Sequence, residues 1–128
     1  MTSGADKHIK LLFVFYFLAG VLVCLRFRFK IFEVYGDSME PTLLRGEKLV
    51  GISHLRLRTG DIVVFEGGIG VNKLIKRIKL IEGNKVIVEG DNRIHSTDSR
   101  QFGPIDKSQI KFKIIYRYFP LERSGFIS

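Results

Sequence analysis

Residues 11–25 form the longest uncharged segment of the chain, bounded by Lys10 and Arg26. As an α-helix this segment covers about 22 Å, less than the roughly 30 Å hydrocarbon core of a bilayer. If the two flanking cations extend toward the headgroups, the helix gains Ile9 and Phe27 and reaches about 28 Å. We therefore expect one transmembrane anchor. The expected organisation is an N-terminal flank, the anchor and a globular domain, over residues 1–10, 11–27 and 28–128.

Two other interpretations of the apolar segment stay open. A cleaved signal peptide also begins with basic residues, here Lys7 and Lys10. Its cleavage site, however, consists of two small residues separated by one residue of any type. The segment is followed instead by Arg26-Phe27-Arg28-Phe29, which favours an uncleaved anchor. A helix buried in a protein core is the other alternative.

After the anchor, the spacing of apolar residues shortens to two, the period of a β-strand. In residues 27–35, Phe27, Phe29 and Ile31 share one predicted face. Further strands are expected at residues 61–66, 71–81, 85–89 and 110–119. A loop over 67–70 separates the first two of these strands, and a turn over 82–84 joins 71–81 to 85–89. Short strands separated by glycine-rich turns predict a mainly β domain, barrel-like or sandwich-like, behind one N-terminal transmembrane helix.

The net charge of +8 raises the possibility of a nucleic-acid partner. Five of the 21 basic residues flank the apolar segment, however, and zinc-finger, RNA-recognition and basic-helix signatures are missing. Basic side chains beside an apolar segment attract anionic headgroups at about 1 kcal/mol each. We therefore predict anionic membrane lipids, and no nucleic acid, as partners. The flanking cations are Lys7, Lys10, Arg26, Arg28 and Lys30.

One lysine falls on the apolar face of a predicted strand. In residues 71–81, regular alternation places Lys76 with Leu74, Ile78 and Leu80, and directs three other cations, Lys73, Arg77 and Lys79, to solvent. Burial disfavours a charged ammonium and can lower its pKa by roughly 3–5 units, which gives the neutral amine that a general base requires. The alternative is a lysine whose stem packs on apolar residues while its charged end reaches water.

A serine lies in a constrained setting shortly after the anchor. Gly36 and Pro41 bracket Ser38 in Gly36-Asp37-Ser38-Met39-Glu40-Pro41, which suits a fixed turn whose backbone N–H groups converge as an oxyanion hole. A serine hydroxyl needs a neighbouring base, and a lysine can serve in place of histidine. The three histidines are far apart and lack metal-ligand spacing, so we expect no metal. Alternatively, Ser38 is a turn serine or a helix N-cap.

With these motifs the sequence resembles the membrane-bound type I signal peptidases. Four boxes match in order: Gly36–Leu43 around the serine, Gly60–Phe65, Ile75–Ile78 around the lysine, and Gly90–Ile105. The last box is the most specific, and with the anchor the resemblance covers nearly the whole chain. It implies a Ser-Lys endopeptidase without a cofactor that removes signal peptides from exported preproteins after small side chains. It also implies a single-pass protein of the plasma (inner) membrane with an extracytoplasmic catalytic domain.

The resemblance assigns roles to individual residues. It implies Ser38 as nucleophile, Lys76 as general base and Ser96 as the hydroxyl that orients the amine. It implies substrate binding for Met39 and Pro41. Supporting roles fall to Gly36 and Asp37 beside the nucleophile, and to the salt-bridge positions Arg77, Asp91, Asp98 and Arg100.

The sequence departs from its larger relatives in two places. Gly36 stands where some relatives carry a serine hydroxyl, so an oxyanion site would depend on backbone N–H groups. Only residues 79–90 separate the third box from Asp91, where larger relatives insert a second β-subdomain, so this chain resembles a minimal catalytic core. The alternatives are a specialised relative with one dedicated precursor, a self-cleaving transcription repressor with a similar dyad, and a non-enzymatic membrane scaffold.

Overall fold

The computed structural model describes residues 3–53, 56–67 and 72–127. The predicted loop over 67–70 and residue 71 lie outside the described residues, apart from Gly67. The helices are α1 (Gly4–Arg28) and α2 (Ser99–Phe102), with 3-10 turns η1 (Lys107–Gln109) and η2 (Leu121–Arg123). The strands are β1 (Phe29–Glu33), β2 (Lys48–Ile52), β3 (Ile62–Glu66), β4 (Lys73–Glu82), β5 (Lys85–Glu89), β6 (Ile105–Asp106), β7 (Ile110–Phe119) and β8 (Gly125–Phe126).

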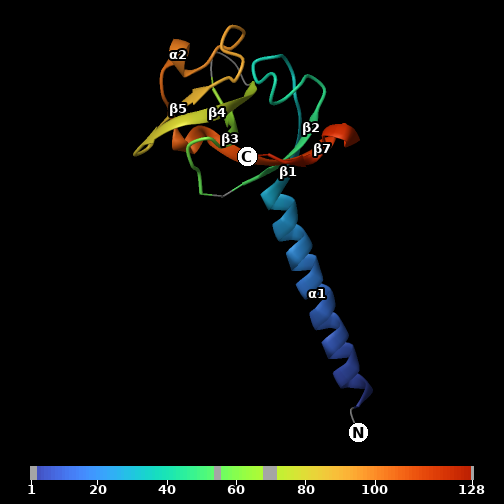
Figure 1. Cartoon of the computed structure of the whole chain (residues 1–128). Helices are drawn as coiled ribbons and strands as arrows, with labels where there is room; N and C mark the ends of the chain where they lie inside the picture. The colour runs from blue at the N-terminus through green and yellow to red at the C-terminus, as the bar shows by residue number, and fades with distance from the viewer. Residues whose placement is uncertain (1–2, 54–55, 68–71, 128) are drawn as a thin grey trace.

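Helix α1 projects from the β domain as a separate rod (Figure 1). Within Gly4–Arg26, an 18-residue window has a mean hydropathy of 2.2, and none of this window is buried against the domain. By length and composition the helix could therefore span a membrane. The exposure of its side chains is incompatible with the alternative of a buried core helix.

The junction between helix and sheet differs from the sequence prediction. The helix continues through Arg28, where a strand was expected from residue 27, and the N–H of Phe29 still bonds the carbonyl of Leu25. The predicted apolar face was also wrong, because Ile31 is 64% exposed whereas Phe32 is buried. Phe32 is drawn inward by edge-to-face packing on Phe112, with ring centroids 5.2 Å apart.

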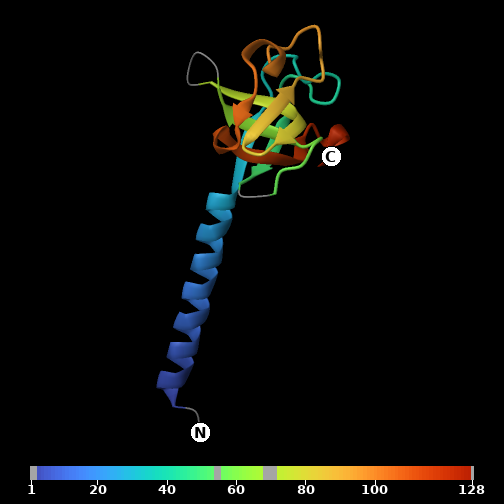
Figure 2. The ribbon, with the colours of Figure 1, turned by 90° about the vertical axis from the view of Figure 1, so that its left-hand side faces the viewer.

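The strands form one antiparallel sheet in the order β1-β2-β7-β3-β4-β5-β6, and β8 pairs with β7. The mainly β domain is thus confirmed, as is the hairpin of β4 and β5, in which Glu82 pairs with Lys85. Figure 2 shows the sheet curling around itself above the end of α1. The curl brings the first strand of the order, β1, close to β4.

Strand β4 changes partners along its length. Its first half, Lys73–Arg77, pairs with β3, and β5 pairs only from Arg77 onward. Among the described residues, the first half therefore keeps one backbone edge without a partner strand. A register shift between Ile78 and Leu80 then rotates the chain. Leu80 is consequently 42% exposed, so the predicted apolar face holds only up to Ile78.

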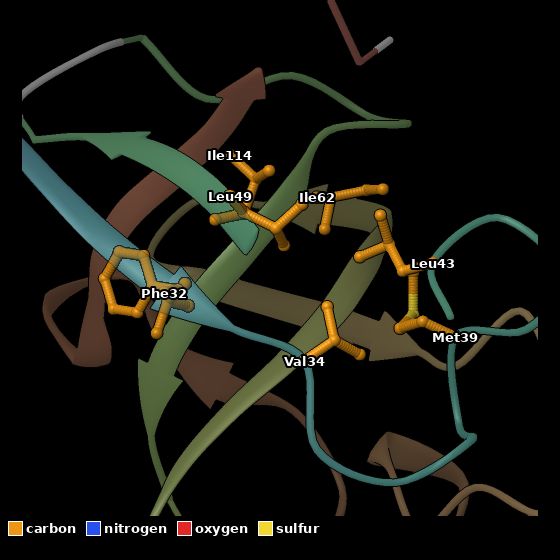
Figure 3. Packing of buried hydrophobic residues seen from close by; sticks show 8 residues of the cluster. Phe32, Val34, Met39, Leu43, Leu49, Ile62 and Ile114 are labelled. Carbon is orange, nitrogen blue, oxygen red and sulfur yellow. The ribbon is translucent and has the colours of Figure 1, made fainter. Parts of the chain in front are cut away.

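The core consists of two clusters on the two faces of the sheet. One lies beneath β3, β4 and β5, and the other is shown in Figure 3. The cluster in Figure 3 includes Met39 and Leu43, which lie in a loop and are 2% and 0% exposed. They point from the loop between β1 and β2 toward Val34, Leu49 and Ile62 (Figure 3). The loop that contains Ser38 is therefore part of the packed core.

We expect Leu49→Ala and Leu80→Ala to differ strongly in stability. Leu49 is 0% exposed and Leu80 is 42% exposed. A buried leucine truncated to alanine lowers the free energy of unfolding by about 2–5 kcal/mol, whereas an exposed one changes it by about 0.5 kcal/mol. Urea unfolding of the two variants in neutral detergent measures both. A large loss at Leu80 would contradict the register shift in β4.

Candidate active site

The loop from residue 36 to residue 43 holds Ser38 in a fixed turn. Gly36 has a φ of +76°, a left-handed conformation that favours glycine. The N–H of Leu43 donates to the carbonyl of Met39 at 2.9 Å, and both side chains are buried. Ser38 itself is half-buried. The turn thus leaves the serine accessible while the core anchors its neighbours.

The segment after β5 fastens this turn from the other side. The backbone N–H of Asn92 donates to the carbonyl of Ser38 at 2.9 Å, and its side-chain amide donates to the carbonyl of Asp37 at 3.1 Å. The hydroxyl of Thr42 donates to Asp91 at 2.6 Å. Thr42 and Asn92 were not predicted as site residues, although both lie inside the matched boxes.

Arg77 and Asp91 form a two-point ion pair that ties β4 to the same segment. The Nε and Nη2 atoms of Arg77 donate to the two Asp91 oxygens at 2.9 and 2.8 Å. The hydrogen bond with Asp91 raises the pKa of Arg77. Burial alone would raise the pKa of Asp91, but hydrogen bonds from Arg77 and Thr42 lower it. Arg77 is half-buried in this pair, so the prediction that it points freely to solvent was wrong.

Lys76, the neighbouring residue on β4, turns its amine into the domain. Lys76 is only 4% exposed. Its Nζ donates to the hydroxyl of Ser96 at 3.2 Å, and that hydroxyl donates to Asp98 at 2.7 Å. Burial lowers the pKa of Lys76, the charge of Asp98 opposes this effect, and the charge of Arg100 adds to it. The arrangement favours a neutral amine more than a solvent-exposed lysine does.

Asp98 is the most deeply buried charged group of the site, at 0% exposure. Its oxygens accept from the N–H of Gly90 at 2.8 Å and from Nε and Nη2 of Arg100 at 2.9 and 2.7 Å. Burial by itself would raise the pKa of this carboxyl. The hydrogen bonds from Arg100, Gly90 and Ser96 outweigh burial and hold the pKa of Asp98 well below its usual range.

Gly90 is the point where the serine loop meets Ser96, the partner of Lys76. A Cβ atom there would collide with both the Ser96 hydroxyl and the Ser38 carbonyl. Only glycine therefore allows the two segments to approach so closely. Ser38 and the Lys76–Ser96 pair accordingly belong to one site. Within the described ranges, neither the hydroxyl nor the N–H of Ser38 makes a hydrogen bond inside the chain.

A second buried carboxylate supports the serine loop, and sequence reasoning missed it. Glu47 is 3% exposed and pairs with Arg117 at 2.8 Å and with Arg123 at 2.5 Å. Arg117 also donates to the carbonyl of Thr42 at 2.8 Å. Burial would raise the pKa of Glu47, but hydrogen bonds from the Leu44 N–H and the two arginines lower it. Glu47 is 70 and 76 positions away from Arg117 and Arg123, so no local pattern connects the carboxylate with its partners.

The remaining predicted residues lie around this centre. Met39 packs in the core next to the serine, although the resemblance implied that it lines the substrate groove. Pro41 is exposed, and its carbonyl accepts from Arg123 at 3.4 Å. Asp37 is half-buried and contributes its carbonyl. In the described part of the chain, no three His, Cys, Asp or Glu residues are grouped so that they could hold a metal ion.

A groove of about 900 Å³ lies between β1 and β4. Its walls include the outer end of β1 and the half of β4 that has an open edge. Ile75, the residue before Lys76, is among the residues that line it. Residues that line it include Ile31, Phe32, Tyr35, Asn72, Leu74 and Ile75.

A serine loop that contacts the partner of a buried lysine, in a β domain carried by an apolar helix, fits a membrane-anchored peptidase. The family model described as signal peptidase, peptidase S26, matches residues 6–90 and 79–119. The chain therefore belongs to the S26 family of signal peptidases, which are proteases.

Relatives in this family come from mitochondria and from bacteria. The chain is 28% identical to mitochondrial inner membrane protease subunit 1 of Homo sapiens, over 88% of this chain and 77% of the relative. It is 31% identical to mitochondrial ATP-independent inner membrane protease subunit 1a of Arabidopsis thaliana, over 85% and 82%. It is 26% identical to signal peptidase IB of Staphylococcus aureus (strain COL), over 84% of both chains.

We expect Asp98→Asn to lower the free energy of unfolding by about 3 kcal/mol at neutral pH, because a buried ion pair loses one partner. The folded-state pKa of Asp98 is depressed, so its contribution is present above the unfolded pKa of about 4 and is lost as pH falls below that value. The difference in the free energy of unfolding between wild type and variant should therefore become smaller in acid.

Urea unfolding at neutral pH and at pH about 3 measures this difference. Asp106→Asn is the matched control, because Asp106 pairs with Lys85 at 2.8 Å on the surface. Such an exposed pair contributes at most about 1 kcal/mol. Equal losses in the two variants would contradict the special role of Asp98.

Proposed function

We propose that this protein is a serine endopeptidase that removes N-terminal signal peptides from exported preproteins, with Ser38 as nucleophile and Lys76 as general base. One observation carries the proposal. The Lys76 amine is 4% exposed and bonded to Ser96 at 3.2 Å, while Gly90 holds Ser96 against the loop of Ser38. A surface lysine would be charged and could not take a proton near neutral pH.

The reaction follows from these positions. The neutral amine of Lys76 takes the hydroxyl proton of Ser38 as the oxygen attacks the scissile carbonyl. The protonated lysine then gives this proton to the departing amine of the mature protein, and an acyl-serine ester remains. Lys76 next takes a proton from water, whose oxygen attacks the ester. The lysine then returns this proton to the Ser38 oxygen as the ester bond breaks and the signal peptide is released. Ser96 keeps the amine in place throughout by its hydrogen bond.

Backbone groups supply the oxyanion site in this proposal. The N–H of Ser38 has no hydrogen-bond acceptor among the described residues and is available to the negative oxygen of the tetrahedral intermediate. Gly36, at a φ of +76°, sets the direction of the turn that presents it. Such preorganised donors stabilise charge that develops only in the transition state.

The substrate would lie extended in the groove between β1 and β4. The first half of β4 offers an open backbone edge there, which can pair with an extended peptide by strand addition. Leu74 and Ile75 line this groove and lead the chain toward Lys76. The apolar residues of its walls, Ile31, Phe32, Leu74 and Ile75, suit the small uncharged side chains that precede a signal peptide cleavage site.

We further propose that the catalytic domain lies on the extracytoplasmic face of the plasma membrane, where exported preproteins emerge. The apolar helix α1 supports membrane anchoring. The mitochondrial relatives make the mitochondrial inner membrane the alternative compartment.

A specialised peptidase with one dedicated precursor is the second candidate. It is favoured by relatives whose names describe them as subunits of inner membrane proteases and by the short connection between β4 and β5, which leaves a compact catalytic domain. A panel of exported preproteins, incubated with the full chain in detergent and analysed by N-terminal sequencing, separates the two. Cleavage of many precursors supports the general enzyme, and cleavage of one supports the specialised enzyme.

We expect Ser38→Ala and Lys76→Ala each to abolish cleavage of the preproteins that the wild type processes. Loss of a general base lowers kcat by about 10²- to 10⁴-fold, and loss of the nucleophile leaves no acyl-enzyme. Far-ultraviolet circular dichroism checks that both variants remain folded, and Lys79→Ala, an exposed lysine on the same strand, is the matched control. Full activity of Lys76→Ala would refute the dyad.

We expect log kcat/KM to rise with pH and then level off. Burial lowers the pKa of Lys76, and only its neutral form takes the proton from Ser38, so activity increases as pH passes upward through this pKa. Initial rates on one cleaved preprotein, from pH about 5 to about 10, measure the profile. A rate that is independent of pH, or that falls over this range, would exclude a lysine base.

A further inference from the structure

A second cavity, of about 880 Å³, opens beside the point where α1 joins the domain. Ile52 and Ser53, at the end of β2, form part of its wall. Ile52 pairs with Phe29, the first residue after the helix, and the N–H of Ser53 donates to the carbonyl of Arg28 at 2.8 Å. The cavity therefore adjoins the membrane end of the domain. It is separate from Ser38 and Lys76, neither of which lines it.

The walls of this cavity are strongly basic. Among the described residues that line it, Glu66 is the one carboxylate, against five cations. Lys113 is neutralised by Asp61 at 3.1 Å. Among the described residues the other four cations form no ion pair with a carboxylate. The five cations are Arg56, Lys73, Lys107, Lys111 and Lys113.

One lysine of the wall, Lys73, has a second lysine beside it. The neighbouring Lys30 and burial lower the pKa of Lys73, and the charge of Glu66 opposes this effect. Lys30 also lies over the ring of Phe112, 5.9 Å from its centroid. Like charges held together in this way gain from an anion between them.

The same cavity has an apolar part, to which Ile52, Leu57, Ile110 and Phe112 contribute. A ligand that fits it should therefore combine a negative charge with hydrocarbon. An anionic glycerophospholipid has this chemistry, since its phosphate lies next to the glycerol and the first acyl carbons. A soluble phosphate offers the charge alone.

We propose that this cavity binds the phosphate headgroup of an anionic glycerophospholipid from the leaflet that α1 enters. The position beside Arg28 and Phe29 selects a lipid over soluble phosphates, because α1 places the cavity at the bilayer surface. Lys107 and Lys111 bind the phosphate together with Arg56, and Lys73 completes the charge at the rim. The proposal does not depend on the peptidase activity.

The test measures lipid retention by the full chain. Wild-type protein in neutral detergent is mixed with equal amounts of phosphatidylglycerol and phosphatidylcholine, and retained lipid is counted by native mass spectrometry. We expect retention of phosphatidylglycerol and a loss of about 25-fold in affinity for Lys107→Gln/Lys111→Gln, since each lysine near an anionic headgroup contributes about fivefold. Lys107→Arg/Lys111→Arg should restore binding.

Two controls make the result specific. Arg45→Gln/Lys79→Gln removes the same charge from exposed positions outside the cavity and should retain phosphatidylglycerol as the wild type does. Inorganic phosphate added in excess over the lipid should not displace it. Equal loss in both double variants, unchanged binding in Lys107→Gln/Lys111→Gln, or full displacement by phosphate would each overturn the proposal. Because the readout is lipid binding, a failure here leaves the proposed peptidase function untouched.

Discussion

The buried carboxylate of Asp98 is the group on which the arrangement of the site depends. A negative charge with no access to water is tolerated only when several donors surround it. Here the donors come from the end of β5, from Ser96 and from α2, whose first turn Asp98 also caps. Satisfying this one charge therefore fixes the course of the chain after β5, and that course carries Ser96 to Lys76.

The electrostatics of Lys76 follow from how the charge of Asp98 is shared. An unpaired carboxylate beside a lysine would keep the amine protonated. The guanidinium of Arg100 donates two hydrogen bonds to Asp98, and its charge offsets part of the effect of Asp98 on the pKa of Lys76. Burial then has the largest effect on the pKa of the Lys76 amine. The site thus contains a structural ion pair between Asp98 and Arg100. Lys76 lies close to this pair but is not the main partner of Asp98.

Local patterns predicted the apolar helix, the main strands and the inward direction of Lys76, because each depends on neighbours within a few residues. They failed at Leu80, where a register shift imposed by β5 reverses the alternation, and at Phe32, which distant Phe112 draws inward. Glu47 with Arg117 and Arg123, and the collision that requires Gly90, involve segments far apart in sequence. Such contacts leave no periodic signal. The grouping of Ser38, Lys76 and Ser96 was predictable only through the resemblance to a family.

The serine loop and the groove between β1 and β4 are under different constraints. In the serine loop, the side chains of Met39 and Leu43 are held in the core, so a substitution there disturbs folding. In the groove, Ile31 and Tyr35 are 64% and 80% exposed, and little else depends on them. In the proposed peptidase, substrate preference can therefore change between related proteins by mutations of β1 and its flank, at little cost in stability, while the serine loop remains fixed.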